Sequence, residues 1–337
     1  QCEFMTFSYA AKIARKCNCP LIHTYHTVYE DYIHYLPGGF SQYKTGAKLE
    51  KKAVACFSRI VLGKASQVIV PTQKVENILK RYGVGGPVAV MPTGIELSRF
   101  KEKISREEKN RMKKALGIPV ENKVLVSVGR LAKEKNLEEL LEYFSRLVKE
   151  GCGKKLTFLI AGDGPDREEL ETLARELQID DQVIFTGMIA PEEVGRYYKL
   201  GDVFVCASSS ETQGITYIEA LACGLPALCR KDECLDQVIT DGYNGFQYEN
   251  YQYFKMHLNY ILEDEDRRLE MGRRGREISQ LYSTWNFCTA AERIYTEAIK
   301  RQERRLDVHR EKKTEGARGR WRDFSHALAR GIIKRGA

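Results

Sequence analysis

Five short apolar runs between residues 123 and 229 constrain the fold more than any other feature of the chain. Each run is continuously apolar, and helical segments beginning near Asn136, Pro165, Pro191 and Gly214 separate them. Strands of this kind are buried on both faces, as in a parallel sheet covered by helices. The pattern predicts a doubly wound α/β domain whose ligands bind beyond the carboxyl ends of the strands. The runs are KVLVSVG, LTFLIAG, QVIFTG, DVFVCA and PALC.

Three further strand-like runs lie upstream: CPLIHT, SQVIVPT and PVAVMPTG. Three strands are few for a second domain of this type, and the chain begins at Gln1 directly in a predicted helix. We therefore expect an N-terminal truncation, with part of the first domain upstream of this chain. The expected units are an incomplete N-terminal domain (1–100), a ligand-binding domain (101–282) and a C-terminal helix with a basic tail (283–337).

Composition and charge describe a soluble protein with a basic end. The chain has 337 residues, 43% of them hydrophobic, which is enough for about two domains. Ten cysteines without a CxxC pair indicate reduced thiols in a cytoplasmic protein rather than disulfides or zinc ligands. Residues 300–337 hold 13 basic and 5 acidic side chains, and the rest of the chain holds 41 of each. The net charge of +8 therefore lies entirely in the tail.

The segment VSVGRLAKEKNLEEL carries the first candidate binding site. Gly129 ends a predicted strand, and Arg130 and Lys135 flank the turn into the next helix. Asn136 as N-cap and Glu139 three residues later match a capping box. Two cations beside a helix N-terminus form an anion site suited to phosphate. The alternative is an ordinary solvated basic turn.

The segment SSSETQGITYIEALACGLPAL carries the second candidate binding site. Gly214 permits close approach of a ligand, and the backbone amides of Ile215 and Thr216 begin a helix. Glu211 precedes this helix and Glu219 lies within it. A nucleoside diphosphate sugar fits the layout, with phosphates on the amides and cations and hydroxyl groups on the carboxylates. The alternative is a pair of structural glutamates neutralised by nearby arginines.

Several of these segments together resemble a known enzyme family. ETQGITYIEALACGLP is similar to the E-x7-E signature of retaining family-four glycosyltransferases, which have the GT-B fold of two doubly wound Rossmann-like domains. GRLAKEKN, AGDGP, FTGMI and GDVFV occur in that family's order. The resemblance implies that Arg130 and Lys135 hold the diphosphate of the donor. It further implies that Glu219 binds the ribose hydroxyls and that Glu211, a catalytic residue, contacts the donor sugar.

The N-terminal segment HTYHTVYEDYIHYLP narrows the resemblance. It is similar to the acceptor-side segment of bacterial 1,2-diacylglycerol 3-α-glucosyltransferases, which implies that His26 is catalytic and lies near the donor sugar. Because His23 and His26 form an HxxH pattern with Glu30 and Asp31 nearby, a metal site is the alternative. The two histidines follow a predicted strand, however, and do not share a helical face.

The resemblance also implies transfer without a cofactor or metal. No DxD motif follows a predicted strand, so cations and helix dipoles are expected to stabilise the leaving diphosphate. The backbone around Met188 and Ile189 would contact the base of the nucleotide.

The segment from Lys44 to Lys64 predicts an amphipathic helix. Its apolar stripe comprises Leu49, Ala53, Cys56, Phe57 and Ile60, and its basic face includes Lys48, Lys51 and Lys52. One interpretation is ordinary packing of the stripe on a core. The other is attachment of the basic face to anionic lipid.

These features predict an enzyme that transfers a hexose, glucose in the first instance, from a UDP-sugar to a lipid such as diacylglycerol with retention of configuration. The expected partners are a nucleotide sugar, a lipid acceptor and an anionic membrane surface, without specific nucleic acid. The protein would act as a peripheral protein on the inner face of the cell membrane. The alternatives are a transferase for another acceptor, a sugar-nucleotide epimerase of the same fold, or a non-catalytic lipid- or nucleic-acid-binding protein.

Overall fold

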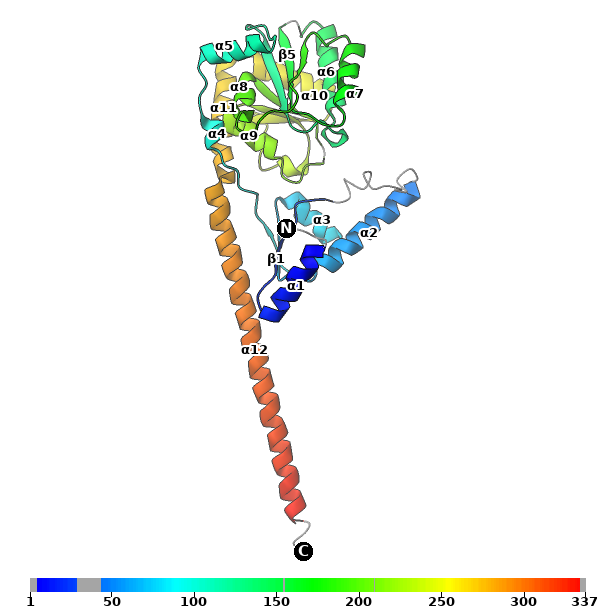
Figure 1. Ribbon diagram of the computed structural model, residues 1–337, viewed down its shortest axis with the longest axis vertical. Helices are drawn as coiled ribbons and strands as arrows, with labels where there is room; N and C mark the ends of the chain where they lie inside the picture. The colour runs from blue at the N-terminus through cyan, green and yellow to red at the C-terminus, as the bar shows by residue number, and fades with distance from the viewer. Residues whose placement is uncertain (1–4, 29–43, 154, 209, 334–337) are drawn as a thin grey trace.

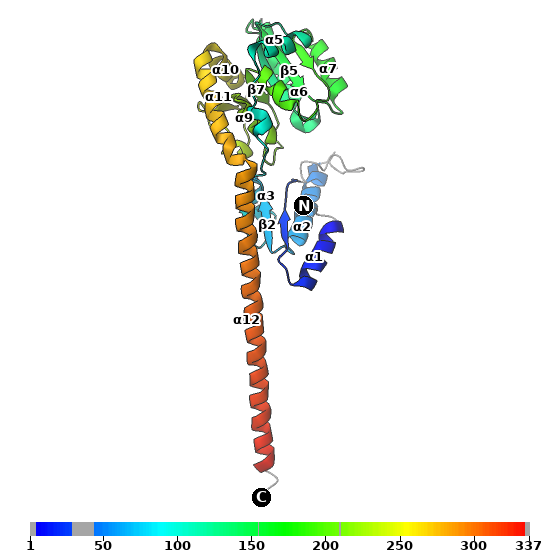
Figure 2. The same cartoon turned by 60° about the vertical axis from the view of Figure 1, so that its left-hand side comes forward.

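Two lobes built on parallel sheets make up the protein, and one long helix begins at one lobe and runs along the other (Figures 1 and 2). A computed structural model describes residues 5–28, 44–153, 155–208 and 210–333. The small lobe contains a sheet of three strands and the large lobe a sheet of six. Both sheets are parallel throughout, as the continuous apolar runs predicted.

The strand order of the large sheet determines where a ligand can bind. The order is β6-β5-β4-β7-β8-β9, so the chain builds outward from β4 in one direction and then returns to build outward from β7 in the other. The loops that leave β4 and β7 therefore diverge to opposite faces and leave a crevice between them. The strands are β4 (Lys123–Val128), β5 (Leu156–Ala161), β6 (Val183–Phe185), β7 (Val203–Cys206), β8 (Ala227–Arg230) and β9 (Gly245–Tyr248).

Alternate residues of each central strand serve two separate cores. Val124 and Val126 of β4 belong to one apolar cluster, and Leu125 belongs to the other. The first cluster is covered by α8 (Val194–Leu200) and α9 (Ile215–Cys223), while α6 (Leu137–Lys149), α7 (Arg167–Glu176) and α10 (Tyr251–Glu263) cover the second. The remaining elements of this lobe are α4 (Ser98–Lys101), α5 (Arg106–Ala115), α11 (Glu265–Ser279), η3 (Lys133–Lys135), η4 (Glu233–Leu235) and η5 (Gln280–Tyr282).

The small lobe has its own core. Tyr25, Val68, Val75 and Leu79 are buried together between its sheet and helices. The sheet order is β1-β2-β3. The elements are β1 (Ile22–Thr24), β2 (Gln67–Val70), β3 (Val88–Val90), α1 (Met5–Cys17), α2 (Lys44–Leu62) and α3 (Gln73–Arg81).

The helix α12 (Thr284–Ile333) joins the lobes and then extends well beyond both of them (Figure 1). It begins beside the large lobe, where Ser283 bridges to Ile95. Further along, Ile294 is buried against Ile69 and Met91 of the small lobe. The lobes are thus connected by packing as well as by the chain itself.

Most elements agree with the sequence. The eight predicted strands are present, and α6, α7, α8 and α9 begin within three residues of the predicted starts. The edge strand β9 was missed because its four residues, GFQY, include a glycine and a glutamine and show no continuous apolar run. The predicted boundaries at residues 100 and 282 stay predictions.

The close packing of α11 on α9 generates a stability prediction. A Cβ atom on Gly272 would lie 2.1 Å from the backbone oxygen of Gly224, which ends α9. Because backbone atoms cannot yield as a flexible side chain does, we expect Gly272→Ala to lower the free energy of unfolding by about 1–3 kcal/mol. Leu269→Ala, on the exposed side of the same helix, is the control and should change it by less than about 0.5 kcal/mol. Urea denaturation measures both, and equal effects would contradict the packing argument.

Candidate active site

Two glycines bring the turns after β4 and β5 into backbone contact. Gly162 has φ +144°, and a Cβ atom there would lie 1.9 Å from the oxygen of Gly129. The contact lets the Gly129 amide donate to Ala161 and the Leu131 amide donate to Asp163, both at 3.0 Å. The turns that contain the GRL and AGDGP motifs therefore form one continuous surface at the carboxyl edge of the sheet.

Lys135 ends the 3-10 helix η3, directly before α6. Asn136 follows in the left-handed region with φ 50°, and its side chain makes no capping hydrogen bond. Instead its amide nitrogen donates to Glu139 at 3.2 Å, and Glu139 also accepts from Tyr248 at 3.0 Å and pairs with Arg230. The predicted capping box is wrong, because Glu139 binds the side chains of Asn136, Arg230 and Tyr248, and the backbone amide of Asn136 donates to the carbonyl of Lys133 instead.

The turn after β7 leads into α9 through Gly214. Its φ of 71° is left-handed, and a Cβ atom would lie 2.6 Å from the ring of Tyr217. The helix consequently begins at Ile215, as predicted, with its first amides at the carboxyl edge of the sheet. Ser208, fully buried, donates to the carbonyl of Glu134 at 3.2 Å and ties this turn to η3.

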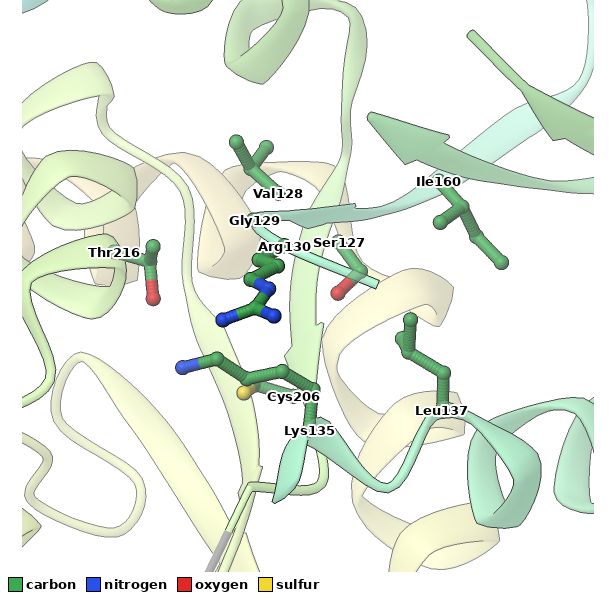
Figure 3. A pocket seen from close by; sticks show the side chains of 9 residues that line it. All are labelled: Ser127, Val128, Gly129, Arg130, Lys135, Leu137, Ile160, Cys206 and Thr216. Atoms are coloured by element: carbon green, nitrogen blue, oxygen red, sulfur yellow. The ribbon is translucent and has the colours of Figure 1, made fainter. Parts of the chain in front are cut away.

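A cavity lies between these turns, at the crevice between β4 and β7. In Figure 3 the Arg130 side chain points toward that of Lys135, and the Lys135 ammonium lies on the side of the cavity that carries Thr216. The arrangement places two cations opposite the first turn of α9, which is the chemistry that binds a diphosphate. The cavity is lined by Ser127, Val128, Gly129, Arg130, Lys135, Leu137, Ile160, Cys206 and Thr216.

A second cavity adjoins the first and reaches the small lobe. Lys135 and Thr216 line both cavities, while His26 and Glu211 line only the second. The structure thus brings together both residues predicted to be catalytic, although 185 positions of sequence separate them. Its lining residues are His26, Pro71, Thr93, Lys135, Glu211, Thr212, Gln213, Gly214, Ile215 and Thr216.

Glu211 and Lys135 form an ion pair at the boundary of the two cavities. The Lys135 Nζ donates to Glu211 Oε1 at 2.6 Å, and the two side chains are 28% and 14% exposed. The sequence predicted separate partners for them, the sugar for Glu211 and the diphosphate for Lys135. An anionic ligand in the first cavity would therefore compete with Glu211 for the Lys135 ammonium.

Glu219 lies on α9 outside both cavities. Its Oε2 accepts from the hydroxyl of Tyr198 at 3.0 Å, and its Oε1 is 3.9 Å from Arg99. Burial raises the pKa of this carboxyl above its ordinary value, and the Tyr198 hydrogen bond and the Arg99 charge oppose the rise. The arginine pairing weighed as an alternative is present for Glu219, and binding of ribose by this residue stays a prediction.

The remaining predicted site residues are distributed as follows. Met188, 86% exposed, and Ile189 follow β6 and line neither cavity. His23 is buried and meets Phe7 edge-on at 5.1 Å between ring centroids, and it lines neither cavity. The Glu30 and Asp31 of the alternative metal site lie outside the described residues.

The amphipathic helix α2 does not pack its predicted apolar stripe on the core, as the simpler of the two interpretations required. Val54, Ala55 and Leu62 pack against the core of the small lobe. The predicted apolar stripe points outward, with Phe57 39% and Ile60 58% exposed. Further exposed side chains on the helix are Lys51, Lys52, Ala53 and Cys56, whereas the side chains of Lys48 and Leu49 lie outside those described.

Sequence reasoning missed the residues that hold the Glu211 turn from the small lobe. Lys74 of α3 forms an ion pair with Asp232 at 2.7 Å, and Gln213 makes two hydrogen bonds to the backbone of Thr93. More than 100 residues separate the members of each pair. The only local signal is the run VPTQK, a polar turn after a strand, which does not reveal its partner.

Comparison with solved structures defines the class of fold. The chain matches Anabaena HepE in complex with UDP and glucose with a TM-score of 0.70 at 18% identity, covering 86% of this chain and 75% of that one. It matches sucrose-phosphate synthase from Thermosynechococcus elongatus with a TM-score of 0.69 at 23% identity, covering 87% and 71%. The fold is GT-B, as the sequence predicted.

Sequence comparison then shows the family. Residues 108–278 match the glycosyl transferases group 1, and residues 2–99 match glycosyltransferase family 4. The chain is 30% identical to the alpha-monoglucosyldiacylglycerol synthase of Acholeplasma laidlawii, over 90% of this chain and 76% of that protein. It is 40% identical to the enzyme of the same name from Streptococcus pneumoniae, over 74% of this chain and 54% of that protein. The chain belongs to the group 1 glycosyl transferases, and it spans about half the length of the pneumococcal relative.

The raised pKa of Glu219 generates a pH prediction. Because the native state binds this proton more tightly than the unfolded chain, the associated stability is fully present below the unfolded pKa and is lost as pH rises through the raised native pKa. Glu219→Gln keeps an acceptor for Tyr198 without the charge. We expect its free energy of unfolding, relative to the wild type, to increase with pH across that window and then level off. Urea denaturation from about pH 4 to pH 8 measures the difference, and a pH-independent difference would contradict the burial argument.

Proposed function

We propose that this protein transfers a hexose from a UDP-sugar to a lipid acceptor, with glucose and diacylglycerol as the first candidates. The observation that carries the proposal is the pair of adjoining cavities that share Lys135 and Thr216. One cavity offers cations and helix amides to a diphosphate, and the other offers Glu211 and His26 to the sugar attached to it. The names of the two relatives, alpha-monoglucosyldiacylglycerol synthase, support the choice of glucose and diacylglycerol.

The charges of the first cavity support departure of a diphosphate without a metal. Arg130 is exposed in this cavity, and Lys135 can exchange the Glu211 carboxylate for phosphate oxygens. The amides of Ile215 and Thr216 at the start of α9 add the positive end of a helix dipole. Since negative charge grows on the diphosphate as the bond to the sugar breaks, these groups stabilise the transition state more than the bound donor.

Loss of the Lys135 contact has a consequence for Glu211. Its carboxylate becomes available to the hydroxyl groups of the donor sugar when the diphosphate binds Lys135.

We propose that the acceptor hydroxyl attacks from the face that the diphosphate leaves, which retains configuration. The bond between the anomeric carbon and the phosphate oxygen breaks, the bond to the acceptor oxygen forms, and the acceptor proton passes to the diphosphate. In this scheme Glu211 and His26 orient the sugar and acceptor.

The outer face of the small lobe supports action at a membrane surface. Phe57, Ile60, Lys51 and Lys52 are all exposed on α2, and α1 also exposes Tyr9 and Ile13. Apolar and basic side chains on exposed helices favour binding at the interface of an anionic bilayer. Among the described residues, no helix has the length and apolar character needed to cross a membrane. We propose peripheral attachment to the inner face of the cell membrane, through α2.

A transfer assay tests the proposed reaction. The full-length protein is incubated with radiolabelled UDP-glucose and diacylglycerol in anionic vesicles, beside a panel of other sugar nucleotides and acceptors. We expect an organic-soluble glycolipid with the α configuration. Glu211→Ala should remove turnover without weakening UDP binding, because the nucleotide binds the other cavity and the Glu211 carboxylate competes with it for Lys135. Transfer only to a soluble sugar, or formation of a β product, would contradict the acceptor or the stereochemistry, respectively.

A vesicle-binding assay tests the surface. The cations act through a field that is screened over about 10 Å at 0.1 M salt, so binding should require anionic lipid and weaken as salt rises. We expect Lys51→Glu combined with Lys52→Glu to reduce co-sedimentation, because the change reverses the charge of the face beside Phe57. The control is a protein lacking residues 300–337, which removes the basic tail and should lower binding only modestly. Equal binding to neutral and anionic vesicles would rule out this docking mode.

A further inference from the structure

The turn that carries Glu211 is held from the other lobe by three separate contacts. The Thr72 hydroxyl donates to the carbonyl of Thr212 at 2.7 Å, and Lys74 Nζ donates to the carbonyl of Glu211 at 3.1 Å. Gln213, only 4% exposed, accepts from the amide of Thr93 at 2.7 Å and donates to the carbonyl of the same residue at 3.0 Å. Each residue from 211 to 213 thus has a partner in the small lobe.

Lys74 has the strongest of these connections. Its ammonium lies 2.8 and 2.7 Å from the two carboxylate oxygens of Asp232, in the loop after β8. The two side chains are 17% and 4% exposed, and Asp232 also accepts from the amide of Cys234 at 2.8 Å, which fixes its orientation. A buried ion pair of this kind depends on good geometry and on additional hydrogen bonds, and both are present.

Glu211 consequently lies between two lysines from opposite lobes. Lys135 of the large lobe binds its side-chain carboxylate, and Lys74 of the small lobe binds its backbone carbonyl. The two contacts respond differently when a donor binds. The diphosphate can displace the Glu211 carboxylate from Lys135, because both compete for the same ammonium. The contact of Lys74 with the Glu211 carbonyl leaves the carboxylate free and keeps the backbone in place.

We propose that Lys74 is a positioning residue for the transfer reaction, with Asp232 as its anchor. It holds the Glu211 turn in the arrangement that meets the donor sugar, and it does so only while the two lobes are docked. The catalytic turn of the large lobe is therefore completed by the small lobe, which couples docking of the lobes to turnover. The effect of Lys74 on turnover rests on the proposed function, whereas its ordering of the Glu211 turn does not.

The structural part is tested by hydrogen–deuterium exchange on the full chain. Lys74→Met removes the charge and keeps the length of the side chain, and we expect the peptide covering residues 208–216 to exchange roughly tenfold faster. Lys74→Arg should restore slow exchange because the guanidinium can reach both partners. The matched control is Lys80→Met on the same helix, where the side chain is 63% exposed and pairs only locally with Glu76. Unchanged exchange in Lys74→Met would overturn the proposal.

A milder variant guards against failure to fold. Thr72→Val preserves the shape of the side chain and removes only the hydroxyl that binds Thr212. If Lys74→Met does not fold, Thr72→Val should still increase exchange in the same peptide, although by a smaller factor. Exchange equal to that of the wild type in this variant would overturn the proposal in the same way.

The catalytic part is tested by kinetics. We expect Lys74→Met to lower kcat by roughly tenfold or more while UDP affinity stays within about twofold, and Lys74→Arg to recover most of the loss. An equal loss of UDP affinity and kcat would show general disruption and would overturn the positioning role. If the wild type transfers no sugar, the proposed function fails, but the exchange experiment still decides whether Lys74 orders the turn.

Discussion

The reversal of strand order between β4 and β7 is the constraint on which the rest of the site depends. Because the chain builds the sheet outward from β4 and then from β7, the turns that leave these strands face each other at one edge. One turn supplies Arg130 and Lys135, and the other supplies Glu211 and the start of α9. Backbone contact between the Gly129 and Gly162 turns makes that edge a firm wall. The kind of ligand that this crevice can bind therefore depends on the strand order and on the few polar residues in the two turns.

The Lys135–Glu211 ion pair lies where the proposed donor would bind. Lys135 and Glu211 neutralise each other across the boundary of the two cavities. A nucleotide sugar carries both a diphosphate for the cation and hydroxyl groups for the carboxylate, so under the proposed function it would separate the pair and give each member a new partner. A free diphosphate would satisfy only Lys135. The ion pair is therefore consistent with a donor that spans both cavities, and the small lobe contributes His26 and Thr93 to the lining of the second.

The sequence predicted the parallel large sheet and where Arg130, Lys135 and Gly214 lie relative to its strands, and the resemblance to a known family assigned His26 and Glu211 to the same donor sugar. These depend on apolar runs, on glycines required by backbone geometry and on motifs whose order matches a known family. It was insufficient where the determinant is a long-range contact. Glu139 matched a helix cap but instead binds Arg230 and Tyr248 from distant strands. The run VPTQK did not reveal the role of Lys74, because that role arises from Asp232, 158 residues away. The Lys135–Glu211 pair could not be predicted because 76 residues separate its members and each motif by itself indicates a ligand.

The most direct test of this account is the affinity of UDP for two single-lysine variants, measured by titration calorimetry. Lys135→Met removes the cation that lines both cavities, and Lys133→Met removes a cation from the same short helix that pairs instead with Glu138 and Glu169. The account predicts that Lys135→Met weakens UDP binding about ten- to a hundredfold, through loss of a charge-assisted hydrogen bond, and that Lys133→Met leaves it unchanged. Equal UDP affinity in the wild type and Lys135→Met would contradict the placement of the diphosphate at the crevice between β4 and β7.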